Sequence, residues 1–210
     1  MRRCPRPHRR PPGGLRRPAI AALVAVTLLA SAALVPVVAA GCGGSPTGVA
    51  HYRSAAYRFS LAVDRRLTEW RSATTASGTA FEVSFVDTRG TIVDGRHLDA
   101  LTVSVVDTAT SPTSAEAAQL SASLPKLGAA MVAKMGPDAQ TGTVSAVSLN
   151  GLSGVVVPFS VTLSGVRQIG WLYLFADSGR IYALTAAASA AQWTAHRPLF
   201  ERAIDSFTVG

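Results

Sequence analysis

Hydrophobic and polar residues alternate with a period of two in three short segments of this chain. These segments are residues 57–63, 81–87 and 101–107. In the first of them the apolar positions are Phe59, Leu61 and Val63. A period of two is typical of a strand with one buried and one solvated face. The pattern therefore predicts three amphipathic strands.

The pattern changes at residues 111–136, where alanine dominates and the two-residue period is lost. Thr113 followed by Glu116 has the form of a capping box, which marks the start of a helix. A Gly-Pro pair at the end of the segment predicts where this helix stops. Pro125 lies inside it, and we expect a kink or a break there because proline lacks a backbone N–H.

Four further strands are expected in hairpin order. They are centred on residues 143–149, 152–163, 168–176 and 180–187. Asn150-Gly151 and the Asp-Ser-Gly-Arg sequence at 177–180 have the chemistry of tight hairpin turns, whose backbone favours Gly, Asn and Asp. Because no helix crosses between these strands, the order predicts an antiparallel sheet.

The last 22 residues predict a C-terminal helix. Ser189 and Gln192 have the spacing of a second capping box. Pro198 is expected to divide the region into a short turn and a final helix. The apolar stripe of that helix consists of Leu199, Phe200, Ala203, Ile204 and Phe207. Strands and helices together predict an α+β domain.

The first 41 residues have the three parts of a secretory signal peptide. Seven arginines lie in the first 17 residues without an acidic residue, an apolar run covers 19–35, and small residues follow. This arrangement is typical of a signal that is removed after export. An uncleaved signal anchor is the alternative, because the apolar run is near the lower limit for crossing a bilayer. The paired arginines leave a Tat-type route open.

The net charge of +8 belongs to this leader. Without its seven arginines, thirteen basic residues face twelve acidic ones, and the remaining charge is close to +1. A nucleic-acid-binding domain needs a basic stripe or patch. We therefore expect no nucleic acid among the partners.

Cys42 follows the leader in the sequence Ala-Ala-Gly-Cys. Ala40, Gly41 and Cys42 resemble the bacterial lipobox, and the resemblance implies a cysteine that is acylated and becomes the mature N-terminus. Two or three acyl chains would give stable membrane attachment. Residues 42–50 are then a flexible tether, and the protein lies on the extracytoplasmic face of the cell membrane. The alternative is a small apolar cysteine within the hydrophobic helix.

Residues 51–210 resemble the PsbP-like family, which includes actinobacterial lipoproteins of the LpqN type. The resemblance rests on the early strand at 57–63, Trp70, the mid-chain helix, and the strand 179–188 before a last helix that ends in Asp205-Ser206-Phe207. It implies an antiparallel sheet flanked by helices on both faces, a PsbP-like α/β/α sandwich, often without catalytic machinery.

No catalytic or metal-binding motif is found. The sequence at 151–154 is one residue too short for a nucleophile elbow, and no phosphate-binding glycine loop is present. After export the histidines are His51, His97 and His196, and their spacing is not that of a metal site. We expect no catalytic residue, no metal and no cofactor.

One charged cluster and one aromatic cluster are the remaining candidates. The first is the set Asp94, Arg96, His97 and Asp99. It is either an acid/base pair, in which Asp94 or Asp99 orients His97, or an exposed hairpin loop, which we favour. The second is the set Trp171, Tyr173, Phe175 and Tyr182, which forms core or lines a cleft for a lipid or small apolar ligand.

These observations favour a membrane-anchored extracytoplasmic lipoprotein that acts as a non-enzymatic binding or accessory module of the cell envelope. The partner would be an envelope protein or lipid that the sequence does not identify. A carrier of a lipid or small apolar ligand is the alternative, and a hydrolase comes third. A cavity behind the 171–175 strand would favour a carrier, whereas a solid core with an exposed apolar patch would favour a protein partner.

Overall fold

The computed structural model describes residues 48–74, 80–108 and 113–210, without the side chains of Arg71 and Ser72. The described residues belong to one compact unit. The predicted signal peptide and Cys42 lie outside the described residues, so their roles stay predictions.

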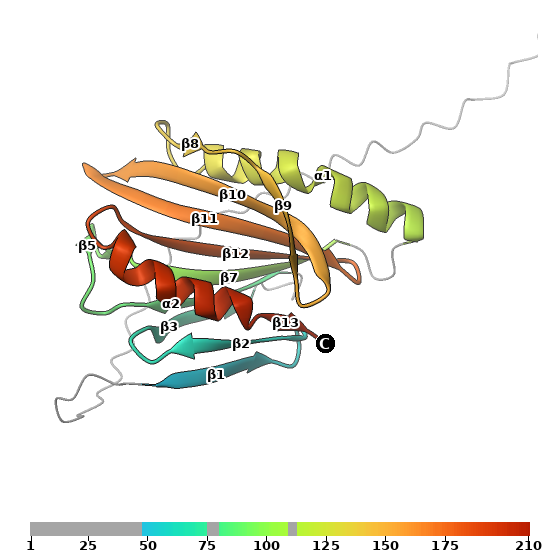
Figure 1. Ribbon diagram of the computed structural model, residues 1–210, viewed down its shortest axis with the longest axis horizontal. Coiled ribbons are helices and arrows are strands. Elements are labelled where there is room, and N and C mark those ends of the chain that lie inside the picture. The colour runs from blue at the N-terminus through green and yellow to red at the C-terminus, as the bar shows by residue number, and fades with distance from the viewer. Residues whose placement is uncertain (1–47, 75–79, 109–112) are drawn as a thin grey trace, which may run out of the picture. The chain divides into compact units, whose positions relative to one another are not determined.

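The centre of the domain is one antiparallel sheet of eight strands (Figure 1). In sheet order its strands are β3 (Thr68–Thr74), β4 (Ala80–Val86), β7 (Ala100–Asp107), β12 (Arg180–Ser189), β11 (Val166–Asp177), β10 (Leu152–Leu163) and β8 (Gln140–Thr141). The eighth strand, β9 (Ser145–Leu149), also pairs with β10. The expected hairpin order of the second half of the chain is confirmed.

The other strands form two smaller sheets. The first has the order β1 (Val49–Ser54), β2 (Phe59–Asp64) and β13 (Thr208–Val209), so it joins the beginning and the end of the domain. The second is the hairpin of β5 (Ile92–Val93) and β6 (Arg96–His97). The strand predicted at 57–63 is therefore part of a separate small sheet.

Helix α1 (Ser114–Ala133) begins at the predicted capping box. The Glu116 N–H donates to the Thr113 hydroxyl at 3.3 Å, and the Thr113 N–H donates to the Glu116 carboxylate at 2.8 Å. Of the kink or break expected at Pro125, the break is excluded, since the helix is continuous through this residue. Pro125 and Ser121 are exposed, so the carbonyl that loses its N–H donor can hydrogen-bond to water.

Helix α2 (Trp193–Asp205) is also continuous through its proline, Pro198, contrary to expectation. Its predicted capping box is wrong as well. Ser189 is the last residue of β12, and the N-cap Gln192 makes no side-chain capping bond. Ser189 is held by a contact with a distant carboxylate, which local spacing does not reveal.

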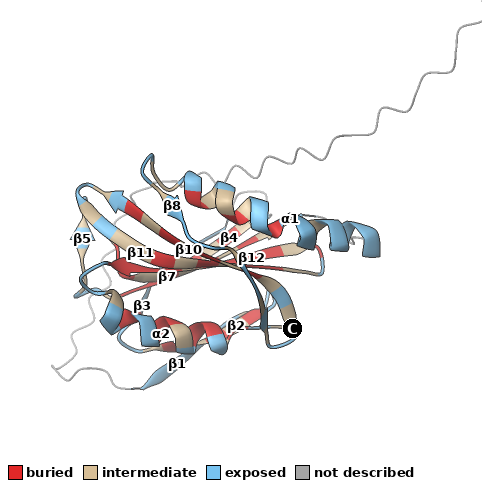
Figure 2. Ribbon diagram, turned by 45° about the horizontal axis from the view of Figure 1, so that its top comes forward, coloured by how far each residue is buried: buried red, intermediate tan, exposed pale blue. Residues whose placement is uncertain are grey.

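The hydrophobic residues form two core clusters that share β12. Tyr182, Leu184 and Ala186 pack in the cluster that contains α2 and β2. The alternate residues Ile181 and Ala183 pack in the cluster that contains α1, β10 and β11. Because successive side chains of a strand point to opposite faces, the central strand contributes to both cores. Figure 2 shows these buried positions concentrated on the central strands.

The hairpin turns match their sequence signals. Asn150 and Gly151 both have positive φ, at 47° and 84°, as a two-residue turn of type I′ requires. The Asn150 side chain also donates to the carbonyl oxygens of Asp205 and Phe207, at 2.9 and 2.8 Å. This turn therefore connects the β9–β10 hairpin to the end of α2.

Candidate functional site

The four aromatic residues predicted for a ligand cleft are divided between core and surface. Phe175 and Tyr182 are 0% and 1% exposed. The Tyr182 hydroxyl donates to the Tyr57 carbonyl oxygen at 3.2 Å, and burial raises the pKa of Tyr182 above its ordinary value. Trp171 and Tyr173 are only half-buried. The structure thus does not bring the four side chains together in one cleft.

Trp171 and Tyr173 instead form a surface with two residues of α2, Trp193 and Arg197. We call these four residues the aromatic shelf. The Trp171 ring contacts Trp193 edge-on, with centroids 4.8 Å apart, and it contacts Tyr173 edge-on at 6.4 Å. Trp193 is half-buried and Arg197 is exposed. The shelf is therefore an ordered aromatic surface in contact with solvent.

Arg197 is held in place by two contacts. Its guanidinium carbon lies 5.2 Å from the centroid of the Trp171 ring, within cation–π range. Its Nε donates to the Glu201 carboxylate at 2.8 Å, one helical turn further along α2. Together these contacts fix the orientation of a cation over the shelf.

Tyr173 keeps its proton at this site. Burial, followed by the nearby carboxylates of Asp205 and Glu201, raises the pKa of Tyr173 above its ordinary value. The hydroxyl is therefore a neutral donor at physiological pH. The shelf offers a partner apolar rings, one hydroxyl and one guanidinium.

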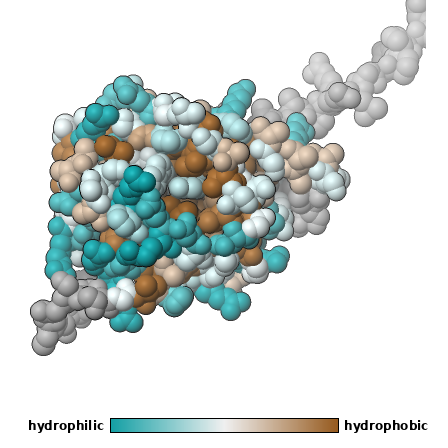
Figure 3. Space-filling model, viewed as in Figure 1, coloured by the Kyte–Doolittle hydropathy of each residue, from teal (hydrophilic) through white to brown (hydrophobic). Residues whose placement is uncertain are grey.

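The apolar surface continues from the shelf across the sheet. Pro158 and Val156 of β10 pair with Trp171 and Tyr173, so they lie beside them on the same face, and both are half-buried. Val147 of β9 is also half-buried and packs against the same core. Figure 3 shows hydrophobic side chains gathered between α2 and β9, over the central strands.

The strand that carries the shelf also contributes buried side chains to the core. Leu172, Leu174 and Phe175 of β11 are each 0% exposed. They contact the two cores on either face of the sheet.

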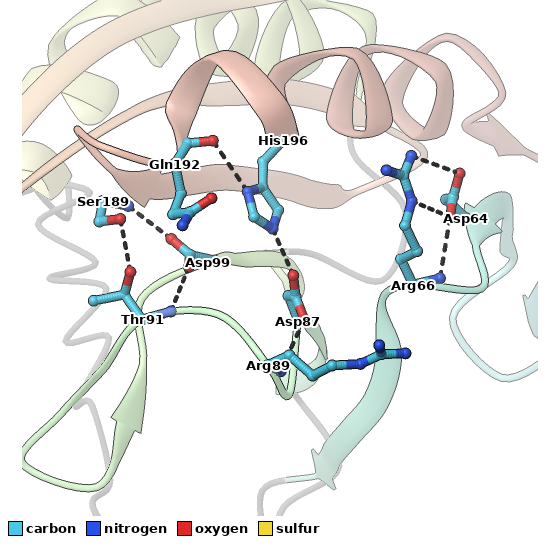
Figure 4. A network of polar contacts seen from close by, with 9 residues as sticks. All are labelled: Asp64, Arg66, Asp87, Arg89, Thr91, Asp99, Ser189, Gln192 and His196. Atoms are coloured by element: carbon cyan, nitrogen blue, oxygen red, sulfur yellow. Dashed lines mark hydrogen bonds and ion pairs between the residues drawn. The ribbon is translucent and has the colours of Figure 1, made fainter. Parts of the chain in front are cut away.

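The charged cluster around His97 is not an exposed loop throughout, so that expectation is wrong for Asp99. Asp99 is 0% exposed. Its carboxylate accepts the backbone N–H of Thr91 at 2.5 Å and that of Ser189 at 2.8 Å. The Thr91 and Ser189 hydroxyls also bond each other at 2.7 Å. Asp99 therefore connects the loop after β4 to the end of β12 (Figure 4).

The proposed acid/base pair is not formed. Asp94 accepts from the Ser164 hydroxyl, and Asp99 has the two partners just described. His97 instead packs edge-on against the Trp70 ring, with centroids 4.5 Å apart, and its Nδ1 is buried without a hydrogen-bond partner. His97 has a packing role here.

His196 is a buried polar residue that the sequence analysis left without a partner. It is 5% exposed and stacks on Phe200. Its Nε2 lies 3.0 Å from the Asp87 carboxylate and its Nδ1 lies 3.1 Å from the Gln192 carbonyl oxygen (Figure 4). Both partners are acceptors, so only the doubly protonated ring can donate to both. The burial of His196 could have been predicted, because it lies three residues before Leu199, on the predicted apolar stripe.

Within the described ranges, no three His, Cys, Asp or Glu side chains gather as they would around a metal ion. No helix in that part of the chain is long and apolar enough to cross a membrane.

Comparison with known proteins identifies a fold but no family. The chain matches no protein-family model and no curated protein sequence. Its structure is similar to that of the cyanobacterial PsbP protein CyanoP from Synechocystis sp. PCC 6803, with a TM-score of 0.56 and 14% identity. The similarity covers 81% of this chain and 98% of CyanoP. The domain therefore has a PsbP-like fold.

Two further similarities are weaker. LpqN of Mycobacterium tuberculosis, a protein involved in cell envelope biogenesis, has a TM-score of 0.41 and 13% identity, over 79% of this chain and 82% of LpqN. The Ran-binding protein Mog1p of Saccharomyces cerevisiae has a TM-score of 0.43 and 10% identity, over 78% of this chain and 96% of Mog1p. At these scores neither similarity carries an argument about function.

Proposed function

We propose that this chain is a membrane-anchored extracytoplasmic lipoprotein whose PsbP-like domain is a non-enzymatic docking module for another protein of the cell envelope. The leader 1–41 would be removed, Cys42 would carry the lipid, and a tether would follow it. The expected tether 42–50 is too long at its end, because β1 begins at Val49. The domain itself would be an α/β/α sandwich with its two helices on opposite faces of the sheet.

The main support for the docking role is the aromatic shelf, through its residue types and the fixed positions of its side chains. Trp, Tyr and Arg are the residue types most enriched among those that dominate binding energy in protein interfaces. Here Trp171, Tyr173 and Trp193 are fixed by ring contacts, and Arg197 is fixed by Trp171 and Glu201. A surface that is ordered before binding loses less conformational entropy when a partner docks.

The packing behind the shelf supports a protein partner over a carried ligand. A carrier needs a concave pocket that buries most of its ligand. Leu172, Leu174 and Phe175 of this strand are buried in the core, whereas the shelf residues reach solvent. Solvent-accessible aromatic residues beside an arginine match the composition of a protein interface.

The contacts of the buried polar residues support a non-enzymatic role. Both ring nitrogens of His196 face acceptors, so neither is free to take a proton from a substrate. Both oxygens of Asp99 accept backbone N–H groups. These groups therefore connect structural elements to one another.

The proposal is tested by capture of the full-length protein, tagged at its C-terminus, from membranes. Trp171→Ala should reduce recovery of the bound protein by roughly thirtyfold, the change expected for an interface residue worth about 2 kcal/mol. Lys126→Ala, which removes an exposed side chain of α1, is the control and should leave recovery unchanged. Equal recovery with both variants contradicts the proposal. Recovery of a stoichiometric lipid that is lost in Trp171→Ala favours the carrier instead.

A further inference from the structure

Three large hydrophobic side chains are exposed in the described part of the chain, and they lie far from the aromatic shelf in the sequence. They are Trp70, Ile92 and Val49, at 57%, 54% and 47% exposure. Trp70 and Ile92 are linked through His97, which packs against the Trp70 ring and pairs with Ile92 across the β5–β6 hairpin. The first two therefore form one apolar patch.

The backbone presents Trp70 outward. In the β3–β4 pairing Glu69 faces Phe85 and Arg71 faces Ser84, so Trp70 is the extra residue of a β-bulge. A bulge turns a side chain away from the regular alternation of its strand. The edge-on contact with His97 at 4.5 Å then fixes the ring in this position.

Val49 belongs to the same end of the domain. It pairs with Asp64, the last residue of β2, and the Arg65 N–H donates to the Gly48 carbonyl oxygen at 3.0 Å. The turn that follows Asp64 leads directly into β3 and Trp70. Figure 1 shows the start of β1, the end of β2 and the β5 hairpin at one end of the domain. We call this end the tip.

The four aspartates at the tip have internal donors, whereas Glu69 is exposed. Asp64 bonds Arg66 and Arg202 at 3.0 and 2.8 Å. The other three aspartates here are Asp87, Asp94 and Asp99, which accept from His196, from Ser164 and from two backbone N–H groups respectively. The remaining acid, Glu69, lies close enough to Tyr52 to add to the effect of burial in raising the pKa of that tyrosine.

The arginines of the tip are free by comparison. Arg65, Arg89 and Arg96 are exposed, and none of them makes an ion pair with another described residue. The Arg89 side chain in Figure 4 extends away from the Asp87 carboxylate that its backbone N–H contacts. The tip therefore presents apolar and cationic side chains together.

We propose that the tip rests on the surface of an anionic lipid bilayer, with Trp70 and Ile92 at the level of the lipid headgroups and Arg65, Arg89 and Arg96 on the phosphates. Tryptophan is enriched at membrane interfaces, and each basic residue near an anionic surface is attracted to it. The inference rests on the proposed lipid anchor. Val49 is only seven residues beyond Cys42, a span of at most about 25 Å when extended. A domain anchored there has this end close to the membrane.

The test uses the full-length acylated protein in vesicles of phosphatidylcholine and phosphatidylglycerol, with and without bromine on the acyl chains near the headgroups. The chain has three tryptophans, and bromine quenches only those that enter the interface. Brominated lipid should lower the fluorescence of the wild type by roughly a third, and this loss should disappear in Trp70→Phe. The double variant Arg89→Glu/Arg96→Glu should also lose most of the quenching.

Lys126→Glu/Lys134→Glu is the matched charge control, because Lys126 is exposed on α1 and Lys134 is exposed at its C-cap. It should quench like the wild type. Mass spectrometry of the N-terminal peptide first establishes whether Cys42 is acylated, and thermal unfolding establishes that each variant is folded. If Cys42 is not acylated, both the proposed lipid anchor and the proposed contact of the tip with the bilayer are wrong. If the protein is acylated but shows no quenching, or shows equal quenching in Trp70→Phe, only the proposed contact of the tip is wrong.

Discussion

Individual buried polar residues hold the loops of this domain in place, and Asp99 is the clearest case. It lies among charged residues in the sequence, yet its carboxylate is fully buried and accepts N–H groups from Thr91 and Ser189. Those donors lie 8 and 90 residues away. The residues next to Asp99 in the sequence therefore predict an exposed loop. In the structure, contacts with distant residues bury its carboxylate and give it a structural role.

Asp99→Ala should accordingly lower the free energy of unfolding by about 2–4 kcal/mol, because it leaves two N–H groups near the core without an acceptor. Asp94→Asn, which neutralises an exposed carboxylate of the same loop and tolerates its positive φ of 49°, should change it by less than about 0.5 kcal/mol. Urea unfolding of both variants measures the difference. Equal stability of the two variants would show that the Asp99 contacts contribute little.

At the scale of elements, helix α2 is attached to the sheets by polar contacts at several points along its length. His196 contacts Asp87 near its start, Arg202 contacts Asp64 near its end, and Asn150 contacts the carbonyls that follow. These contacts supplement the apolar face of α2, which packs in the core. They predict that the position of α2, and so of the aromatic shelf, depends on pairs far apart in sequence.

Asn150→Gly tests the contact between the hairpin turn and α2. Glycine accepts the positive φ of this position, so the turn is kept while two hydrogen bonds are lost. We expect a loss of about 1–2 kcal/mol in the free energy of unfolding. Ser178→Gly is the control, because Ser178 also has positive φ, at 48°. If both substitutions have the same effect on stability, the Asn150 side chain does not support α2.

The Asp64 contacts predict a dependence on pH. The hydrogen bond from Arg66, followed by weaker contributions that include Arg202, holds the pKa of Asp64 below its ordinary value of 3.8, against the opposing effect of burial. The ionised group therefore stabilises the fold above that value, and this stabilisation is lost as the pH falls through the lowered pKa. The wild type should be more stable than Asp64→Asn at neutral pH, and the two should converge in acid. A stability difference that persists unchanged in acid would contradict this.

The elements themselves could largely be predicted from the sequence, and their partners could not. Alternation predicted β2, β4 and β7, and Asn-Gly and Ser-Gly turn signals predicted the hairpins of the second half. The same alternation could not show that β2 leaves the large sheet and pairs with β1 and β13. The breaks predicted at Pro125 and Pro198 did not occur. A proline disrupts a helix least where the carbonyl that loses its N–H donor faces solvent, as it does at both positions.

Of the candidate site, the sequence predicted that Trp171 and Tyr173 share one face of a strand, because they alternate along it. It indicated core or a cleft there, and the structure shows a half-buried surface. The contribution of α2 could not be predicted, because nothing in the sequence places Trp193 and Arg197 beside Trp171. Likewise Phe175 continues the same alternation but is buried, because Phe207 covers it. The position of Phe207, which follows α2, therefore helps to determine where the strand passes from surface to core.

At the scale of the whole molecule, the proposed lipoprotein consists of a lipid anchor, a folded domain and a docking surface on that domain. The lipid anchor depends on Cys42, whose thiol would accept the lipid. Cys42→Ala should abolish incorporation of a fatty-acid probe and leave the precursor uncleaved. Metabolic labelling followed by electrophoresis checks both. Label that persists in Cys42→Ala would show that this cysteine is not the attachment site.

The docking surface is the central claim, and photo-crosslinking in intact cells tests it most directly. A photoreactive amino acid in place of Tyr173, which is half-exposed on the aromatic shelf, should give one discrete adduct with an envelope protein. The same amino acid in place of Lys126, exposed on α1, should give none. A discrete protein adduct at position 173 alone is the result that the account predicts. No adduct at position 173, or the same adducts at both positions, would contradict it.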